Sequence, residues 1–170
     1  MWYKIKIFFY SLGNFYRYFS VIYNDRQYDH EFLFNILERK LSLMAAATSK
    51  ANRYESSEKE VQRMKTCINL IRNLKNDYYG MEHSDYHDTE WEFIPSDECE
   101  GCSELKTTVI TENFDDYFNK HKSATKRVLK QLDGIDSKYT QAIFVGAERH
   151  RKAREILFKI LDRHVESWWM

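Results

Sequence analysis

The chain has few residues that break helices, with one proline and five glycines among 170 residues. Proline removes a backbone donor and glycine lowers helix stability, so their scarcity favours long helices over an all-β or loop-rich fold. Glycine-rich phosphate loops, nucleophile elbows and the H-E-x-x-H zinc motif are also missing from the sequence. We therefore favour a non-enzymatic protein, and an enzyme with an unfamiliar site is the alternative.

Cysteine is scarce as well, since the chain contains only Cys67, Cys99 and Cys102. Three thiols do not suggest a disulfide scaffold, and Cys67 lies on an apolar helical stripe where we expect a buried thiol. No run approaches the ~18 apolar residues that a membrane span needs. No small-residue cleavage site follows the short apolar run at 7–10. We expect a soluble, cytoplasmic protein without a membrane partner.

Aromatic residues are abundant, at 16% of the chain, and many of them lie in residues 1–27. Lys4, Lys6, Arg17 and Arg26 are interleaved with them. Such an arm can stack on nucleotides or single-stranded nucleic acid, or form an interfacial helix on a membrane or a partner. It can also pack on the core or swap to a second copy. The sequence leaves these alternatives open.

The length of the chain fits a single domain, residues 1–170, with an ordinary hydrophobic core. Apolar residues recur at helical spacing on both sides of a short stretch with strand-like alternation. We predict a mainly α fold, a compact helical bundle with one small β-hairpin inserted between the second and third main helices. Its parts are an aromatic N-terminal arm (1–27), a helical pair (28–90), a β-hairpin (91–111) and C-terminal helices (112–170).

Capping residues mark the starts of the predicted helices. Asp29 is a good N-cap for the first helix, and Ser57 with Glu60 forms a capping box for the second. Gly80 is expected to interrupt or bend the second helix, and Ser137 to begin the long final one. The apolar stripe of the second helix consists of Val61, Met64, Ile68, Ile71, Leu74 and Tyr78.

Zero formal net charge conceals a strong polarity along the chain. From Asn76 to Leu105 there are ten carboxylates and no Lys or Arg, whereas from Tyr117 to the end there are twelve basic residues and six acidic ones. Such a chain can meet a host or phage protein, or its own copy, acidic surface to basic surface. The alternative is two solvated surfaces of opposite sign. The preferred partner-binding residues are Glu82, Asp85, Asp88, Trp168 and Trp169.

Four residues have the spacing of a zinc site: His83 and His87 at i,i+4, and Cys99 and Cys102 as C-x-x-C. If residues 81–88 are helical, both imidazoles project from one face, and the cysteine pair completes a tetrahedron. Four protein ligands leave no open position, so the zinc would be structural. The alternative is an exposed acidic loop that binds no metal.

Basic residues crowd one part of the final helix, at Arg149, Arg151 and Arg154. Arginine suits bidentate phosphate contacts, so this cluster predicts, as an alternative function, binding of a nucleotide or nucleic acid. Glu148 and Glu155 interrupt the basic face, which argues against a continuous groove for DNA. The other interpretation is a solvated helix face.

Four segments spread over most of the chain share a likeness with known sequences. They are Tyr23–Asp29 (YNDRQYD), Tyr78–His87 (YYGMEHSDYH), Phe114–Phe118 (FDDYF) and Ala153–Trp169 (AREILFKILDRHVESWW). In these segments the chain resembles a family of short uncharacterised proteins encoded by tailed bacteriophages. The resemblance implies a phage-encoded protein in the cytoplasm of a bacterial host, and it carries no catalytic residues across.

Together these observations predict a non-enzymatic phage accessory protein that acts by binding. The expected action is anti-defence, by inhibiting or sequestering a host defence factor. A role as a virion structural or assembly protein, acting as an oligomer, is a further alternative to the nucleotide-binding one.

Overall fold

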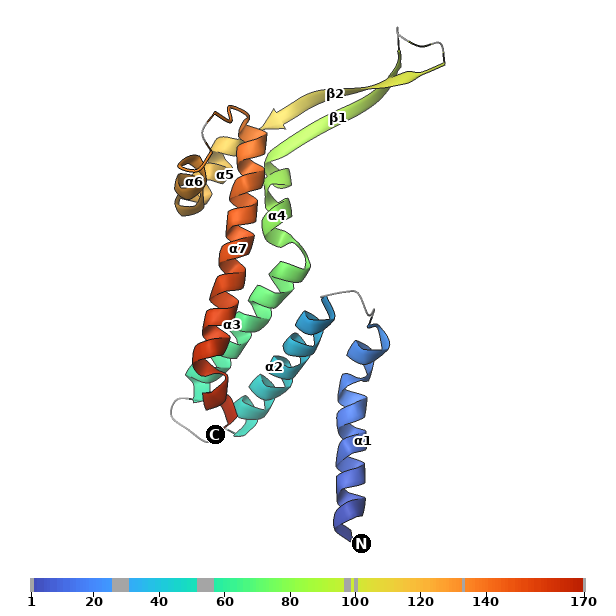
Figure 1. Cartoon of the computed structure of the whole chain (residues 1–170), viewed down its shortest axis with the longest axis vertical. Coiled ribbons are helices and arrows are strands. Elements are labelled where there is room, and N and C mark those ends of the chain that lie inside the picture. Colours follow the sequence, from blue (N-terminus) through green and yellow to red (C-terminus); the bar gives the residue numbers. More distant parts are fainter. Residues whose placement is uncertain are drawn as a thin grey trace. The chain divides into compact units, whose positions relative to one another are not determined.

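The computed structural model describes residues 2–25, 31–51, 57–96, 99, 101–132 and 134–169. Over these residues the chain is mainly α-helical, with one antiparallel two-stranded hairpin (Figure 1). The predicted fold class is therefore confirmed. None of the described helices is long and apolar enough to cross a membrane.

The chain forms two compact units. The first consists of Met1–Asn76 and Glu155–Met170, and the second of Asp77–Arg154. The long helix α7 (Lys138–His164) contributes residues to both units, with the change after Arg154. The single domain predicted from chain length stays a prediction.

Helices build the first unit, and α3 provides most of its buried apolar residues. Besides the end of α7 they are α1 (Trp2–Tyr23), α2 (Glu31–Ala51), α3 (Ser57–Lys75) and the 3-10 helix η2 (Glu166–Trp169). The stripe predicted for α3 is buried because its members recur every three or four residues on one side of the helix. Its buried members are Val61, Met64, Ile68, Ile71 and Leu74, and Cys67 is buried with them as predicted.

Two carboxylates tie the helices of the first unit together. Glu38 of α2 accepts hydrogen bonds from Arg72 Nε at 2.7 Å and from Lys75 Nζ at 3.1 Å, both on α3. Glu60 of α3 accepts a hydrogen bond of 2.5 Å from Trp168 Nε1. Trp168 is thereby held against α3 by a polar contact as well as by burial.

The start of α7 agrees with the sequence. The hydroxyl of Ser137 accepts a hydrogen bond of 3.3 Å from Thr140 N, so Ser137 caps α7 as predicted. α3 spans Ser57–Lys75 and follows residues outside the described ones, so the capping box of Ser57 and Glu60 stays a prediction. Asp29, the predicted cap of α2, lies outside the described residues.

The end of α3 differs from the prediction. Asp77 adopts φ 46° and ψ 30°, a left-handed conformation that cannot continue a right-handed helix. The break therefore lies at Asp77 and not at Gly80. Tyr78, expected on the stripe of α3, instead begins the next helix and is exposed.

Short elements accompany the first part of α7 in the second unit. In chain order they are α4 (Tyr78–Met81), the 3-10 helix η1 (Glu82–Tyr86), β1 (His87–Pro95), β2 (Ser103–Glu112), α5 (Phe114–Lys120) and α6 (Lys122–Leu129). One apolar cluster is formed by α5, α6 and α7. Each of these helices contributes two buried side chains to it. Its buried members are Phe114, Tyr117, Ala124, Val128, Ala142 and Val145.

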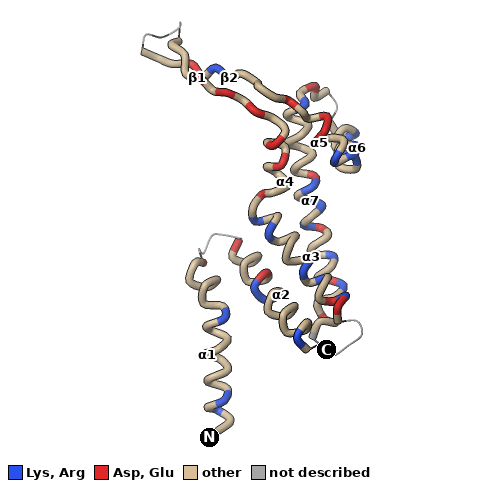
Figure 2. Tube along the Cα trace, turned by 180° about the vertical axis from the view of Figure 1, so that it is seen from behind, with Lys and Arg blue, Asp and Glu red and all other residues tan. Residues whose placement is uncertain are grey.

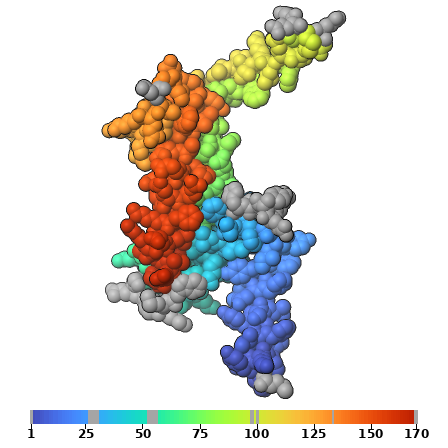
Figure 3. Space-filling view, viewed as in Figure 1, coloured from blue at the N-terminus to red at the C-terminus, as the bar shows by residue number. Residues whose placement is uncertain are grey.

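The hairpin extends beyond the strands that the sequence predicted. Its base is closed by a hydrogen bond of 2.9 Å from Asn113 N to Tyr86 O. The two strands extend away from α4, α5 and α7 as a ribbon (Figures 1 and 3), and all ten residues of β2 are exposed. The ribbon is therefore supported by the helices of its unit only at its root.

Helix α7 comes very close to α4 at Gly146. A Cβ atom placed on Gly146 would lie 2.7 Å from Tyr79 O and 3.5 Å from the Cα atom of Gly80. These are backbone atoms, which cannot swing aside as the end of a flexible side chain can. The helix crossing therefore requires glycine at this position.

Gly146→Ala should destabilise the protein by about 1–3 kcal/mol, because the added methyl group overpacks the crossing. The free energy of unfolding from urea titration measures this change. Gly13→Ala in α1 is the matched control, since nothing lies within 4 Å of the added Cβ atom. The control should be neutral or more stable by roughly 0.5–1 kcal/mol. Equal stability of Gly146→Ala and the original chain would contradict the close approach.

Candidate functional site

A buried carboxylate, Glu82 of η1, is surrounded by basic side chains. The Glu82 side chain is 2% exposed, and its Oε1 atom accepts a hydrogen bond of 2.7 Å from Lys120 Nζ. The same oxygen lies 3.2 Å from His121 Nε2, and Oε2 forms an ion pair with Arg149 Nη1 of α7. We call these four residues the Glu82 cluster. One carboxylate thus links η1, the junction of α5 and α6, and α7.

The charges of the Glu82 cluster compensate one another. Burial alone would raise the pKa of Glu82, but the hydrogen bonds from its basic neighbours outweigh burial and lower this pKa to about 2. Burial, reinforced by the charge of Arg149, lowers the pKa of His121, which favours the neutral imidazole. The hydrogen bond to Glu82 raises the pKa of Lys120. The arrangement suits a structural link better than proton transfer.

Aromatic rings complete the surroundings of Arg149. Its guanidinium carbon lies 5.3 Å from the ring centroid of Tyr79 and 6.0 Å from that of Tyr117. A cation over an aromatic face is attracted by the ring quadrupole. Arg149 is therefore held by a carboxylate and by two rings at once.

The two histidines predicted as zinc ligands lie among aromatic rings at the root of the hairpin. His83 in η1 is buried, with its ring 5.6 Å from that of Tyr139. His87 stacks on Phe114 at 5.4 Å and 17°, and its ring lies 5.2 Å from that of Tyr139. His87 is the first residue of β1, so the two imidazoles do not share a helical face as the zinc prediction assumed.

The cysteines of the predicted zinc site lie at the other end of the hairpin. Cys99 and Cys102 form a disulfide beyond the last residues of β1. At ~3.3 Å per residue, β1 places His87 roughly 26 Å from that end. The described residues contain no group of three or more potential metal ligands. The four predicted ligands are therefore not brought together, because a strand separates the pairs and both thiols are used in the disulfide.

The predicted partner-binding residues divide into two groups. Asp85 and Asp88 are exposed, as a contact surface requires. Glu82 and Trp168 are buried, and this corrects the expectation that they form an exposed surface. Glu82 is enclosed by its basic partners, and Trp168 by its place against α3. Trp169 is the last residue of η2.

The three arginines predicted to bind phosphate do not converge. Arg149 belongs to the Glu82 cluster, and Arg151 Nε donates a hydrogen bond of 2.8 Å to Glu148. Positions 149 and 151 are about 200° apart around a helix, so the two side chains leave α7 on opposite sides. Arg154 is exposed. Acidic residues, Glu148 and Glu155, flank the basic residues of this part of α7. Figure 2 shows both charges along the helix.

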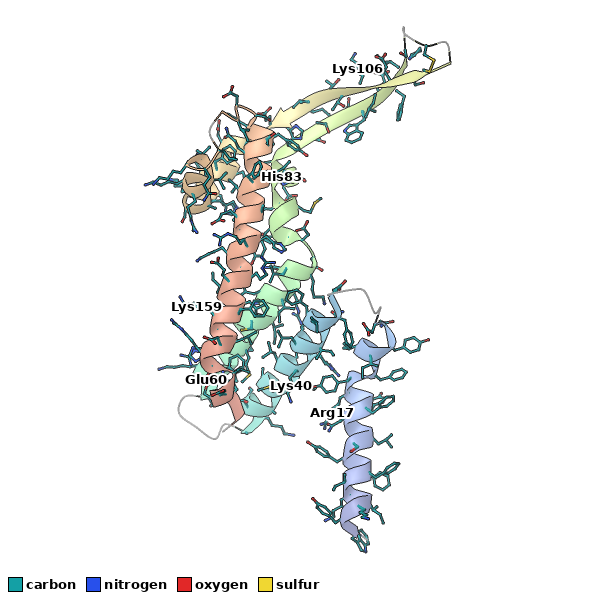
Figure 4. The ribbon with its side chains drawn as sticks, in the orientation of Figure 1. Arg17, Lys40, Glu60, His83, Lys106 and Lys159 are labelled. Atoms are coloured by element: carbon teal, nitrogen blue, oxygen red, sulfur yellow. A yellow bond between two sulfur atoms is a disulfide. The ribbon has the colours of Figure 1, made fainter. Side chains whose placement is uncertain are left out.

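Helix α1 exposes its apolar side chains. Within α1, whose residues are all described, none is buried. The half-buried residues Asn14, Tyr18 and Val21 lie on one side, and Arg39 Nε of α2 donates a hydrogen bond of 2.9 Å to Arg17 O. Side chains project outward around this helix (Figure 4). On the side opposite the half-buried residues lies what we call the aromatic arc: Ile5, Phe8, Phe9, Leu12, Phe15, Tyr16 and Phe19.

The hairpin carries a second exposed apolar surface. Alternate residues of a strand share a face, and cross-strand partners lie on the same face. The register pairs Phe93 with Leu105, and Val109 with Thr89, which accepts a hydrogen bond of 2.7 Å from Trp91 Nε1. We call the shared surface the apolar hairpin face: Trp91, Phe93, Leu105 and Val109.

The sequence did not indicate the Glu82 cluster. Lys120 and His121 follow Glu82 by 38 and 39 residues, so no local spacing indicates the pairing. The one signal was the position of Glu82 in a segment without basic residues, where a buried carboxylate must find a distant cation.

No protein-family model, no curated protein and no solved structure matches this chain. Function must therefore follow from the geometry of the chain's own residues.

Glu82→Gln should destabilise the protein by roughly 3 kcal/mol or more at pH 7, because Arg149, whose side chain is 15% exposed, loses the carboxylate that pairs with it. The loss of stability caused by Glu82→Gln should become smaller as the pH is lowered. Ionised Glu82 contributes stability above its unfolded pKa of 4.5, and this contribution is lost as pH falls through 4.5 towards about 2. Urea titrations at pH 7 and pH 3 should therefore show a smaller difference in the free energy of unfolding between the two proteins at pH 3 than at pH 7.

Glu148→Gln is the matched control for this substitution. Glu148 pairs with Arg127 and Arg151, whose side chains are 44% and 49% exposed, so solvent screens both pairs. The control should cost at most about 1 kcal/mol. Similar losses for both variants, or a pH-independent loss for Glu82→Gln, would contradict the role assigned to Glu82.

Proposed function

We propose that the chain is a non-enzymatic binding protein whose main docking surface is the aromatic arc of α1. The observation that carries this proposal is a helix of 22 residues without one buried residue. Covering one large apolar side chain is worth about 1.5–3 kcal/mol. A contiguous set of seven such side chains, all exposed on one side of a helix, is characteristic of an interaction surface.

The composition of the aromatic arc supports a protein partner. Phenylalanine and tyrosine are enriched at the centres of protein interfaces, where they bury much area for little loss of side-chain entropy. α1 also carries Lys4, Lys6 and Arg17 and no acidic residue. The partner surface should therefore be apolar at its centre and acidic around it.

The polar interior of the second unit supports a role without catalysis. Each charged group of the Glu82 cluster is already engaged by another group of the cluster. The resemblance to phage-encoded proteins suggests the biological setting, the cytoplasm of a bacterial host. There the partner would be a phage protein or a host defence factor that the chain inhibits or sequesters.

A pull-down from phage-infected bacterial cells tests the role of the aromatic arc. The bait is the full chain with an affinity tag, compared with the variant F8E/F15E. Two carboxylates within the arc should reduce the amount of each specifically captured protein at least tenfold, because burying an unpaired charge is unfavourable. Quantitative mass spectrometry of the captured proteins measures this loss.

The matched control is Y3E/Y10E, which places the same charges on exposed positions of α1 outside the arc. The control should capture its partners as the original chain does, and circular dichroism should show equal helix content in all three proteins. Equal capture by F8E/F15E, or an original chain that captures neither a foreign protein nor an untagged copy of itself, would overturn the proposed docking surface.

A further inference from the structure

The aromatic arc and the apolar hairpin face have opposite electrostatic surroundings. α1 contains Lys4, Lys6 and Arg17 and no carboxylate. The two strands of the hairpin contain five carboxylates and, as the only Lys or Arg within the strands, Lys106. Figure 2 shows the acidic residues along both strands. The chain thus has two exposed apolar surfaces, one on a cationic helix and one on an anionic ribbon.

The carboxylates of the hairpin act on both faces of the ribbon. Glu90 and Glu92 alternate with Trp91 and Phe93, so they point to the face opposite the aromatic side chains. The hairpin has only two strands, and its backbone is thinner than the Debye length of about 8–10 Å. A cation held against the apolar hairpin face is therefore still attracted by these glutamates.

We infer that the aromatic arc of one copy docks on the apolar hairpin face of a second copy. This inference rests on the proposed function, because it names the partner of the aromatic arc. The hairpin supplies what that partner must have: Trp91 and Phe93, which are 68% and 76% exposed, with carboxylates around them. Two-stranded ribbons are marginally stable alone, so docking of a helix also stabilises the hairpin.

The two surfaces agree in length. Ile5 and Phe19 lie roughly 21 Å apart along α1 at ~1.5 Å per residue. Strand β1 spans roughly 26 Å at ~3.3 Å per residue. A helix laid along the ribbon can therefore place most of its aromatic arc on the hairpin.

Like-to-like pairing is less favourable than this mixed pairing. Two α1 helices would bring six cations together without a carboxylate, and the strands of two hairpins would bring together ten carboxylates with two lysines. Like charges at an interface disfavour association and opposite charges favour it. Charge thus selects the contact between unlike surfaces.

A contact between unlike surfaces is heterologous, so after pairing one copy keeps a free apolar hairpin face and the other keeps a free aromatic arc. Repeating such a contact produces a closed ring or an open filament. The chain would therefore self-assemble head to tail, which fits the structural or assembly role among the alternatives for its function.

The experiment mixes two variants that are each blocked at one surface. F8E/F15E keeps the hairpin but loses the aromatic arc, and W91T/F93T keeps the arc but loses the aromatic side chains of the hairpin. Threonine preserves strand propensity. Each variant alone should be monomeric by sedimentation velocity. Their mixture should form a one-to-one dimer, twice the monomer mass of 20.6 kDa, and grow no further.

Control variants distinguish the loss of a docking surface from a general effect of substitution on the fold. Y3E/Y10E and I94T change α1 and the hairpin outside the two apolar surfaces, and both should assemble as the original chain does. The original chain should form species larger than a dimer as its concentration rises. Raising the salt concentration should weaken the mixed dimer, since screening reduces the attraction between α1 and the hairpin.

Three results would overturn the inference. A dimer of W91T/F93T alone indicates pairing of two α1 helices, and a dimer of F8E/F15E alone indicates pairing of two hairpins. A monomeric original chain at its highest soluble concentration excludes self-assembly. If the original chain is monomeric, the pull-down still tests the proposed function. Capture of a foreign protein that depends on the aromatic arc would support the proposed function, although the inference about self-assembly would have failed.

Discussion

The second unit depends on the neutralisation of one buried carboxylate. Glu82 lies in the short segment that leads from α4 into the hairpin, and its basic partners lie on α7 and at the junction of α5 and α6. Removing a carboxylate from water is costly unless cations and hydrogen bonds replace the solvent. Because all three basic groups converge on Glu82, the root of the hairpin has one defined position relative to the helices of its unit.

This fixed root allows the hairpin to extend without further support. Near the root, His83 and His87 pack on Tyr139 and Phe114, and beyond them the strands are exposed. A two-stranded ribbon with open edges and an apolar face is unfavourable for an isolated molecule. The exposed apolar side of helix α1 is unfavourable for the same reason, because it faces solvent. The opposite charges of these two surfaces give a physical reason for their coexistence in one chain.

Local patterns predicted the elements well, and distant pairings poorly. Apolar residues at every third or fourth position predicted the buried stripe of α3. The hydroxyl of Ser137 predicted the cap of α7, and the alternation of apolar and polar residues predicted the hairpin. The break at Asp77 was placed too late, because glycine is the usual sign of a left-handed residue and an aspartate here adopts that conformation. The predicted zinc site combined two histidines at helical spacing with a C-x-x-C pair. Strand β1 separates the histidines from the cysteines. Glu82 and Trp168 were expected on the surface, but their partners are remote in sequence.

The sequence by itself determined a mainly helical chain with one hairpin, because helical and strand periodicities are local properties of neighbouring residues. It also determined the separation of acidic and basic segments and the aromatic character of residues 2–23. Only the tertiary structure decided which of these residues are exposed. Lys120, His121 and Arg149 meet Glu82 because the fold of the second unit brings them there, and the same packing leaves the aromatic side chains of α1 and of the hairpin uncovered. Burial and long-range charge pairing depend on the whole arrangement of elements, which no short stretch of sequence contains.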